Sequence, residues 1–289
     1  MADINIFASV TEKKLYEYFA PAKGDKLKEA MAYSVLDGGK RIRACLVLMF
    51  CSLHDGDQLS ALPLASALEA VHAHSLVHDD LPCMDNSDMR RGKPSCHKRY
   101  GEATALLAGD GLLNKAYGII AGAKELSFEQ KARAVEILAY HTGEDGMLGG
   151  QQLDMYYENK QTNEDILNLI QSKKTGALIR AACLLGCVAA EKWDDESFKR
   201  AADYAENLGR AFQITDDILD VTSTEKELGK PVGSDEYNGK STYVSVLGLS
   251  KAREKAAQLT QNAIDALSVY GQRGEKLIKL ARLLTERKS

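Results

Sequence analysis

Helical periodicity is the feature that most constrains the fold of this 289-residue chain. Apolar residues recur three and four positions apart, as in Tyr204, Ala205, Leu208 and Ala211, and this spacing places them on one face of an α-helix. Alternation of period two is almost absent, and the chain has only five prolines. The sequence therefore predicts one all-α domain over residues 1–289, with about ten or more helices.

Local signals mark where some of these helices begin. Ser127 and Gln130 have the spacing of a capping box, and Asp194 is expected to cap a later long helix. No Gly-, Pro- or Ser-rich linker interrupts the helical pattern, which supports a single domain.

Composition and charge narrow the class of protein. Apolar residues make up 45% and charged residues 27% of the chain, as in globular proteins, and the net charge of −4 argues against nucleic acid as the main partner. The six cysteines form no CxxC pair, which favours reduced thiols. The sequence offers no signal peptide and no apolar run long enough to span a bilayer. We therefore expect a cytoplasmic protein without stable membrane insertion.

The stretch Val71–Gly92 begins as an apolar helix and ends as a charged loop. Like charges about 4 Å apart repel by about 4 kcal/mol at an effective dielectric near 20, so clustered carboxylates share a cation, shift their pKa values or face open water. Apolar flanks argue against open water, and Pro82 is expected to bend the chain and bring Asp85 back toward Asp79. We interpret the stretch as a metal–phosphate site with these charged members: Asp79, Asp80, Asp85, Asp88, Arg90 and Arg91.

A second aspartate cluster, Asp216–Asp220, lies at the end of a later predicted helix. Asp216 and Asp220 are four positions apart and therefore project from one helix face. The tripeptide Gly-Lys-Pro follows the first aspartate of each cluster after thirteen residues, at Gly92 and Gly229. This echo is either chance or the trace of two similar half-sites, each a carboxylate-bearing helix end followed by a basic loop.

A third candidate site lies where Gly38 and Gly39 precede a helix that begins with Lys40-Arg41-Ile42-Arg43. Free backbone N–H groups, the positive end of the helix dipole and fixed cations would coincide there, which is typical of an anion site. A solvated basic turn is the alternative.

Together these pieces suit the chemistry of a diphosphate. Carboxylate oxygens favour Mg²⁺, which takes one or two protein carboxylates and completes its shell with water and phosphate oxygens. Arginine and lysine would bind the remaining phosphate oxygens, and the metal would polarise the ester oxygen. If the substrate is allylic, ionisation leaves a carbocation that needs an apolar cavity with a few oxygen dipoles, and Thr175 and Gln213 would supply them.

The residues also carry a family resemblance that covers nearly the whole chain. Asp79–Asp85 with Arg-Arg-Gly after it, and Asp216–Asp220, resemble the two aspartate motifs of the trans-isoprenyl diphosphate synthases, the polyprenyl synthetase family. Further blocks resemble the family's other motifs in the same order: GGKRIR (Gly38–Arg43), KTGAL (Lys174–Leu178), FQITDD (Phe212–Asp217) and GKPVGSD (Gly229–Asp235).

This resemblance implies the isoprenoid synthase fold, with mostly antiparallel helices around a central apolar cavity, usually as a homodimer. It implies isoprenoid biosynthesis through condensation of isopentenyl diphosphate with an allylic diphosphate, three Mg²⁺ ions, and a final proton transfer to the released diphosphate. Asp80 belongs to the catalytic motif, and Thr175 and Gln213 would lie near the cation. The other implied roles are metal binding by Asp79, Asp85, Asp216 and Asp220; allylic diphosphate binding by Arg90, Lys174 and Lys230; a further phosphate contact by Lys240; and isopentenyl diphosphate binding by Gly39, Lys40, Arg43, His72 and Arg91.

Product length is expected to depend on the residues one turn or more before Asp79. His74 stands where bacterial farnesyl enzymes usually carry Tyr, and Ser75 is beside it. We expect these side chains to form the floor of the product cavity. Farnesyl diphosphate is the favoured product, and geranylgeranyl diphosphate is the alternative.

Other classes fit the sequence less well. A zinc site of His72, His74 and His78 is disfavoured because their spacing scatters them around the helix. The pair His78-Asp79 is also typical of all-α metal phosphohydrolases, but these explain neither the second cluster nor GGKRIR. A terpene cyclase usually carries a different second metal motif. A non-catalytic subunit of a heteromeric synthase would have lost an aspartate cluster.

Overall fold

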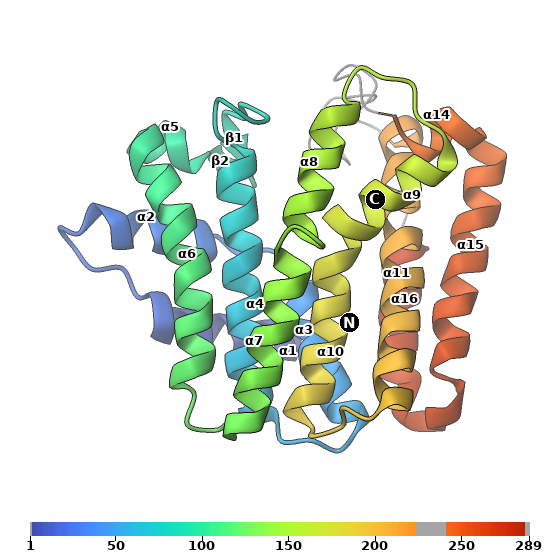
Figure 1. The fold of residues 1–289 in the computed structure, drawn as a ribbon, viewed down its shortest axis with the longest axis horizontal. Coiled ribbons are helices and arrows are strands. Elements are labelled where there is room, and N and C mark those ends of the chain that lie inside the picture. The colour runs from blue at the N-terminus through green and yellow to red at the C-terminus, as the bar shows by residue number, and fades with distance from the viewer. Residues whose placement is uncertain (1, 224–240, 287–289) are drawn as a thin grey trace. The chain divides into compact units, whose positions relative to one another are not determined.

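Helices form nearly all the regular structure in residues 2–223 and 241–286, the part of the chain that the computed structural model describes (Figure 1). The all-α class predicted from the sequence is confirmed. The chain divides into two compact units, one of Met1–Ile137 with Leu185–Lys192 and one of Leu138–Leu184 with Trp193–Ser289. The single domain predicted from the sequence and the central apolar cavity implied by the family resemblance stay predictions.

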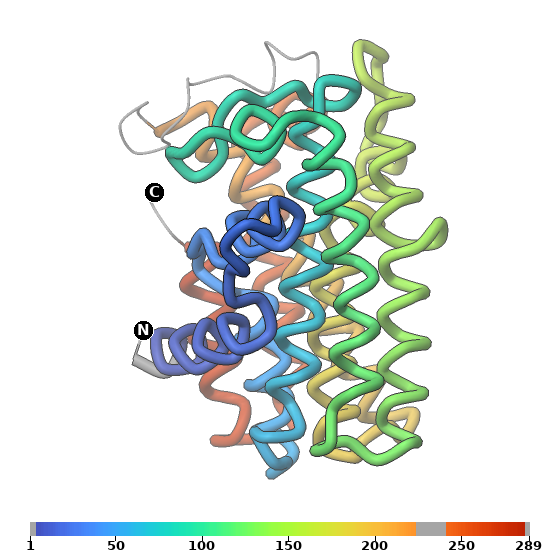
Figure 2. Tube along the Cα trace, turned by 90° about the vertical axis from the view of Figure 1, so that its left-hand side faces the viewer, coloured from blue at the N-terminus to red at the C-terminus, as the bar shows by residue number. Residues whose placement is uncertain are grey.

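Unit 1 is built around one long apolar helix, α4, which is buried along most of its length and packs against α3 and α6. The views in Figures 1 and 2 both show α4 and α6 side by side. The elements of the unit are α1 (Ala2–Phe19), α2 (Lys26–Val35), α3 (Ile42–Leu53), α4 (Gln58–Asp79), β1 (Met89–Arg90), β2 (Lys93–Pro94), α5 (Cys96–Tyr100), α6 (Glu102–Gly122) and most of α7 (Phe128–Thr142).

The loop after the first aspartates contains a small hairpin that the sequence did not predict. Strands β1 and β2 pair antiparallel, with Met89 opposite Pro94 and Arg90 opposite Lys93. Arg91 and Gly92 between them have φ of 52° and 78°. Positive φ at both central residues is the requirement of a type I′ turn, whose twist matches that of paired strands. Strands of two residues are too short to produce visible alternation.

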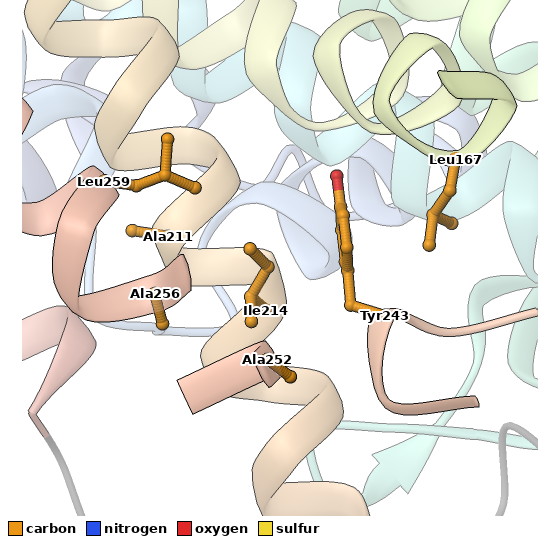
Figure 3. Close-up of a cluster of buried hydrophobic side chains, with 7 residues drawn as sticks. All are labelled: Leu167, Ala211, Ile214, Tyr243, Ala252, Ala256 and Leu259. Carbon is orange, nitrogen blue, oxygen red and sulfur yellow. The ribbon is translucent and has the colours of Figure 1, made fainter. Parts of the chain in front are cut away.

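Unit 2 is organised by α11, the longest helix, which packs along α15. Small side chains such as Ala211, Ala252 and Ala256 line their contact, together with Ile214 and Leu259 (Figure 3). The elements are the end of α7, α8 (Met147–Tyr157), α9 (Glu164–Lys174), α10 (Gly176–Ala189, whose last residues belong to unit 1), α11 (Asp195–Thr222), α14 (Tyr243–Leu247), α15 (Leu249–Ala266), the 3-10 helix η1 (Ser268–Gly274) and α16 (Glu275–Thr285).

The predicted helix caps are present. The N–H of Ser127 donates to Gln130 Oε1 at 2.8 Å, and the N–H of Gln130 donates to Ser127 Oγ at 3.2 Å. Asp194 accepts the N–H of Ser197 at 3.0 Å at the start of α11. In the described ranges, every helix is too short or too polar to cross a membrane.

Candidate active site

The first aspartate cluster lies where α4 ends and the chain folds back. The N–H of Asp85 donates to the carbonyl oxygen of Asp79 at 2.9 Å, so the loop returns to the helix end as Pro82 predicts. Asp79 is half-buried and Asp85 is exposed. Asp88 is engaged elsewhere, because its carboxylate forms an exposed ion pair with Lys98 at 2.8 Å.

Asp80 differs from the other two aspartates because it is buried and paired inside the protein. Its side chain is 3% exposed and accepts Arg90 Nη2 at 2.5 Å and Arg90 Nε at 3.1 Å, the fork geometry of a bidentate pair. This hydrogen bond, followed by the charges of Asp79 and Asp85, raises the pKa of Arg90. Asp80 therefore holds a permanent cation beside the two aspartates predicted to bind metal.

Arg91, the next residue, bonds to a different segment. Its Nη1 donates to the carbonyl oxygen of Gly38 at 2.6 Å. Gly39 has φ of 115°, and a Cβ added there would lie only 3.0 Å from Arg91 Nη2. Because Gly39 has no side chain, the guanidinium of Arg91 can approach the turn. Lys93 bonds to the Asp37 carboxylate and ties the hairpin to the same turn.

The start of α3 differs in part from the predicted anion site. Glu69 of α4 is buried and accepts the N–H of Ala44 at 3.1 Å and Nη1 of Arg41 at 3.3 Å. Arg41 points into the protein, where its Nη2 donates to the Val35 carbonyl oxygen at 2.8 Å. The Glu69 carboxylate therefore occupies part of the helix N-terminus that was predicted to bind an external anion. Lys40, next to it, is exposed.

Arg43 and His72 form a second predicted pair, with Arg43 Nη1 3.4 Å from His72 Nε2. A guanidinium only donates, so Nε2 accepts and the imidazole proton lies on Nδ1. Burial and then the charges of Arg43 and Arg91 lower the pKa of His72 well below 6.5. Arginines gathered around a neutral imidazole are typical of a site that binds a phosphate-like anion. Of the predicted isopentenyl group, the structure brings Arg43, His72 and Arg91 together.

The two other histidines of α4 face α6. His74 is buried and its Nδ1 donates to the Gly109 carbonyl oxygen at 3.0 Å. Burial and His78 lower the pKa of His74 to about 4. A Cβ at position 109 would lie 2.1 Å from His78 Nε2, so glycine lets α6 pass the histidines. In residues 2–223 and 241–286, no three His, Cys, Asp or Glu side chains lie close enough together to hold a metal ion by themselves.

Ser75 has a different orientation from its neighbour. Its Oγ donates to the carbonyl oxygen of His72 at 2.9 Å, and the residue is half-buried. Ser75 lies about 40° around α4 from Asp79, whereas His74 lies about 140° away. Ser75 therefore shares the face of Asp79, and the roles of both residues in product length stay predictions.

Unit 2 brings together Lys174, Thr175 and Gln213. Thr175 Oγ1 lies 3.2 Å from Gln171 Oε1 and 3.5 Å from Gln213 Oε1. Lys174 Nζ donates to Asp154 Oδ2 at 2.6 Å. Asp154 is half-buried and had no predicted role. Its sequence signal was its place shortly after Gly143–Gly150, a stretch with four glycines in eight residues.

The second aspartate cluster lies near the end of α11. Asp216 is half-buried, and Asp220 and Asp217 are buried. The carboxylate of Asp217 accepts the N–H of Tyr243 at 2.7 Å and Nε2 of Gln213 at 3.0 Å. Lys230 and Lys240, which the resemblance assigns to phosphate binding, lie outside the described residues.

The predicted metal ligands fit Mg²⁺ by their chemistry. Asp79 and Asp85 in unit 1, and Asp216 and Asp220 in unit 2, offer only carboxylate oxygens. Mg²⁺ keeps several waters and commonly takes only one or two carboxylates besides the phosphates of its substrate. Each pair therefore suits such an ion.

Comparisons with known proteins identify the family of this chain. A family model described as polyprenyl synthetase matches residues 24–279. Farnesyl diphosphate synthase of Haemophilus influenzae is 43% identical over 265 residues, which cover 91% of this chain and 88% of that protein. Chloroplastic geranylgeranyl pyrophosphate synthase of Catharanthus roseus is 42% identical over 265 residues, covering 91% and 74%. A crystal structure of an FPP/GFPP synthase from Zymomonas mobilis matches with a TM-score of 0.88 and 35% identity, over 98% of this chain and 97% of that one.

An all-α chain with two carboxylate clusters and a separate arginine cluster is therefore matched along most of its length by one family. The chain belongs to the polyprenyl synthetase family.

Proposed function

We propose that this chain is a Mg²⁺-dependent short-chain prenyltransferase. It condenses isopentenyl diphosphate with dimethylallyl or geranyl diphosphate and yields farnesyl diphosphate. The relatives named farnesyl diphosphate synthase, at 42–43% identity over most of the chain, support this activity.

One observation in the structure carries the proposal. The hairpin sends two neighbouring arginines to different partners, Arg90 to Asp80 and Arg91 to the carbonyl oxygen of Gly38. Unit 1 thus contains an arginine beside aspartates and, next to it, arginines beside a neutral histidine. A condensation of two diphosphates needs this difference, because only the allylic diphosphate must leave and requires a metal. The other diphosphate has to be held without being activated.

The roles of the residues follow from that difference. Arg90 and Lys174 bind and orient the allylic diphosphate, with Lys230 and Lys240 as further phosphate contacts. Asp79, Asp85, Asp216 and Asp220 would hold three Mg²⁺ ions, which would supply positive charge that stabilises the leaving diphosphate. Arg43, His72, Arg91 and Lys40 hold isopentenyl diphosphate through charge-assisted hydrogen bonds.

The bond-forming step requires protection of the carbocation. Thr175 and Gln213 present a hydroxyl and an amide oxygen, whose dipoles stabilise positive charge where water is excluded. The released diphosphate then removes a proton from the condensed product, so a separate protein base is unnecessary. The homodimer and cytoplasmic location expected from the sequence are part of this proposal.

Product analysis tests the proposal. The purified chain is incubated with Mg²⁺, isopentenyl diphosphate and dimethylallyl, geranyl or farnesyl diphosphate, and the products are separated by chain length. We expect dimethylallyl and geranyl diphosphate to be extended to the C15 product and farnesyl diphosphate to be a poor starter. Efficient extension of farnesyl diphosphate would favour the geranylgeranyl alternative. Phosphate release without a new C–C bond would favour the phosphohydrolase.

A further inference from the structure

Asp217 is the aspartate of the second cluster that has no predicted role. It is 4% exposed, and its Oδ1 lies 3.0 Å from Gln213 Nε2, one turn earlier on α11. Its Oδ2 accepts the N–H of Tyr243 at 2.7 Å. Both oxygens of this carboxylate are therefore engaged with groups of unit 2.

The chemistry of this contact fixes the orientation of Gln213. A carboxylate accepts hydrogen bonds and cannot donate them, so Gln213 must turn its NH₂ group toward Asp217. The amide oxygen is then at the opposite edge of the carboxamide, 3.5 Å from Thr175 Oγ1. The amide oxygen of Gln213 is the negative end of the amide dipole and therefore the end that stabilises a cation. It points toward the hydroxyl of Thr175, which is also predicted to stabilise the carbocation.

Asp217 is itself held by a rigid support. Tyr243 begins α14, and its ring is fully buried, with Leu167 on one side and Ile214 on the other in Figure 3. The hydroxyl of Tyr243 donates to Asn168 Oδ1 at 2.8 Å, and burial raises its pKa to about 12, so it stays protonated. The backbone N–H that bonds Asp217 is thereby fixed to α9, the helix that ends beside Thr175.

We propose that Asp217 is a positioning residue, which fixes the Gln213 carboxamide with its oxygen toward Thr175 so that both oxygen dipoles act on the carbocation. This inference rests on the proposed function. The role of Asp217 then differs from that of Asp216 and Asp220, which are predicted to bind metal, because Asp217 acts by orienting the amide of Gln213.

Asp217→Asn is the first test. The new side chain keeps the volume and one acceptor oxygen for Tyr243, but its NH₂ group faces Gln213 and favours the flipped amide. Loss of an orienting partner typically lowers activity about tenfold to a hundredfold, and we expect this in kcat. Both KM values and the Mg²⁺ concentration for half-maximal rate should stay within about twofold, because substrate and metal contacts are unchanged. Asp203→Asn, an exposed change of the same charge on α11, is the control and should leave kcat unchanged.

Rescue distinguishes positioning from a general structural role. Gln213→Glu alone places two carboxylates one turn apart and should lower kcat. In the double variant with Asp217→Asn, the amide at position 217 donates to the carboxylate at position 213, which reverses the donor and acceptor of the wild type. The net charge of the double variant equals that of the wild type. The double variant should therefore exceed the kcat of either single variant. Gln213→Leu should lower kcat about as much as Asp217→Asn, by about tenfold to a hundredfold, and decides the matter even if Asp217→Asn does not fold.

Three outcomes would overturn the inference. The first is a double variant whose kcat falls by the product of the two factors lost in the single variants. The second is a Mg²⁺ concentration for half-maximal rate that shifts tenfold or more in Asp217→Asn. The third is an unchanged kcat in Gln213→Leu. Failure of the proposed function is recognised separately, because the wild-type chain would then form no C–C bond before any variant is compared, and the inference would fall with it.

Discussion

Two neighbouring clusters of charged side chains in unit 1, both predicted to bind a diphosphate, differ in whether they contain carboxylates. The first holds Arg90 among Asp79, Asp80 and Asp85, and the second holds Arg43 and Arg91 around the neutral imidazole of His72. The hairpin of β1 and β2 separates the two clusters and supplies one arginine to each. The difference suggests how one protein distinguishes two diphosphates. In the proposed function, the site with carboxylates recruits metal and promotes departure of its diphosphate, and the site without carboxylates only binds.

Removing one carboxylate from the first site should have the largest effect. Asp79→Asn should lower kcat by about a thousandfold, since electrostatic stabilisation of the leaving group is usually the largest single contribution. The melting temperature without ligand should change little or rise, because clustered like charges are relieved. Steady-state kinetics and thermal unfolding measure both quantities.

Asp88→Asn is the matched control for that variant. Asp88 lies in the same loop, is exposed and pairs with Lys98. Its change should leave kcat within about twofold, because exposed ion pairs contribute little. Equal losses in the two variants would mean that general acidity of the loop, and not a metal site, supports catalysis.

The second site is tested through the close approach of Gly39 to Arg91. Gly39→Ala would place a Cβ 3.0 Å from Arg91 Nη2, and we expect the guanidinium to shift. The KM for isopentenyl diphosphate should rise about tenfold, the loss of roughly 1.4 kcal/mol of binding, while the KM for geranyl diphosphate stays unchanged.

Gly24→Ala controls for backbone strain in that comparison. Gly24 also has a positive φ, 90°, but a Cβ there meets no atom within 4 Å. It should reproduce any loss of stability without the change in KM. If Gly39→Ala raises the KM for geranyl diphosphate as well as that for isopentenyl diphosphate, the two sites are not independent.

Product length should respond to α4 while both sites stay intact. His74→Ala removes a buried ring that contacts α6 at Gly109. If His74 forms the floor, longer products appear in the chain-length profile and both KM values stay near those of the wild type. An unchanged profile would move the floor to Ser75, which shares the face of Asp79, and Ser75→Tyr should then shorten the product.

The smallest effect concerns pH and the neutral histidines. His72 and His74 have folded-state pKa values below 6.5, and that of His74 is about 4. Protonation below pH 6.5 therefore favours the unfolded chain, so stability is full above pH 6.5 and is lost as the pH falls toward 4. Each group contributes up to about 1.4 kcal/mol per pH unit to this loss.

Urea unfolding of the wild type and of His74→Gln between pH 7 and pH 5 measures this slope. The variant should show a shallower decline, because it lacks one of the groups that bind protons on unfolding. Parallel curves for the two proteins would contradict a neutral, buried His74.

Local patterns accounted for much of the fold and part of the site. The capping box of Ser127 and Gln130 and the return of Asp85 to Asp79 were predicted because residues close in sequence determine them. The hairpin at Arg91-Gly92 was missed because two-residue strands leave no alternation.

Long-range partners were not predicted, for a physical reason. Periodicity reports which face of a helix is apolar but not which helix will cover it. Glu69 bonds Arg41, 28 positions away, and its only local signal was that no other Asp, Glu, Lys or Arg stands between Gln58 and Asp79. The ion pair of Asp154 with Lys174 likewise depends on the packing of α8 beside α9.

In the proposed function, the neighbouring residues Arg90 and Arg91 serve different substrates. The most direct measurement is the KM of each substrate for Arg90→Leu and Arg91→Leu. We expect Arg90→Leu to raise the KM of the allylic diphosphate at least about tenfold more than that of isopentenyl diphosphate, and Arg91→Leu to do the reverse, since each removes a charge-assisted contact. If both variants raise the same KM, the two arginines share one site and the division between an activating and a merely binding site is wrong.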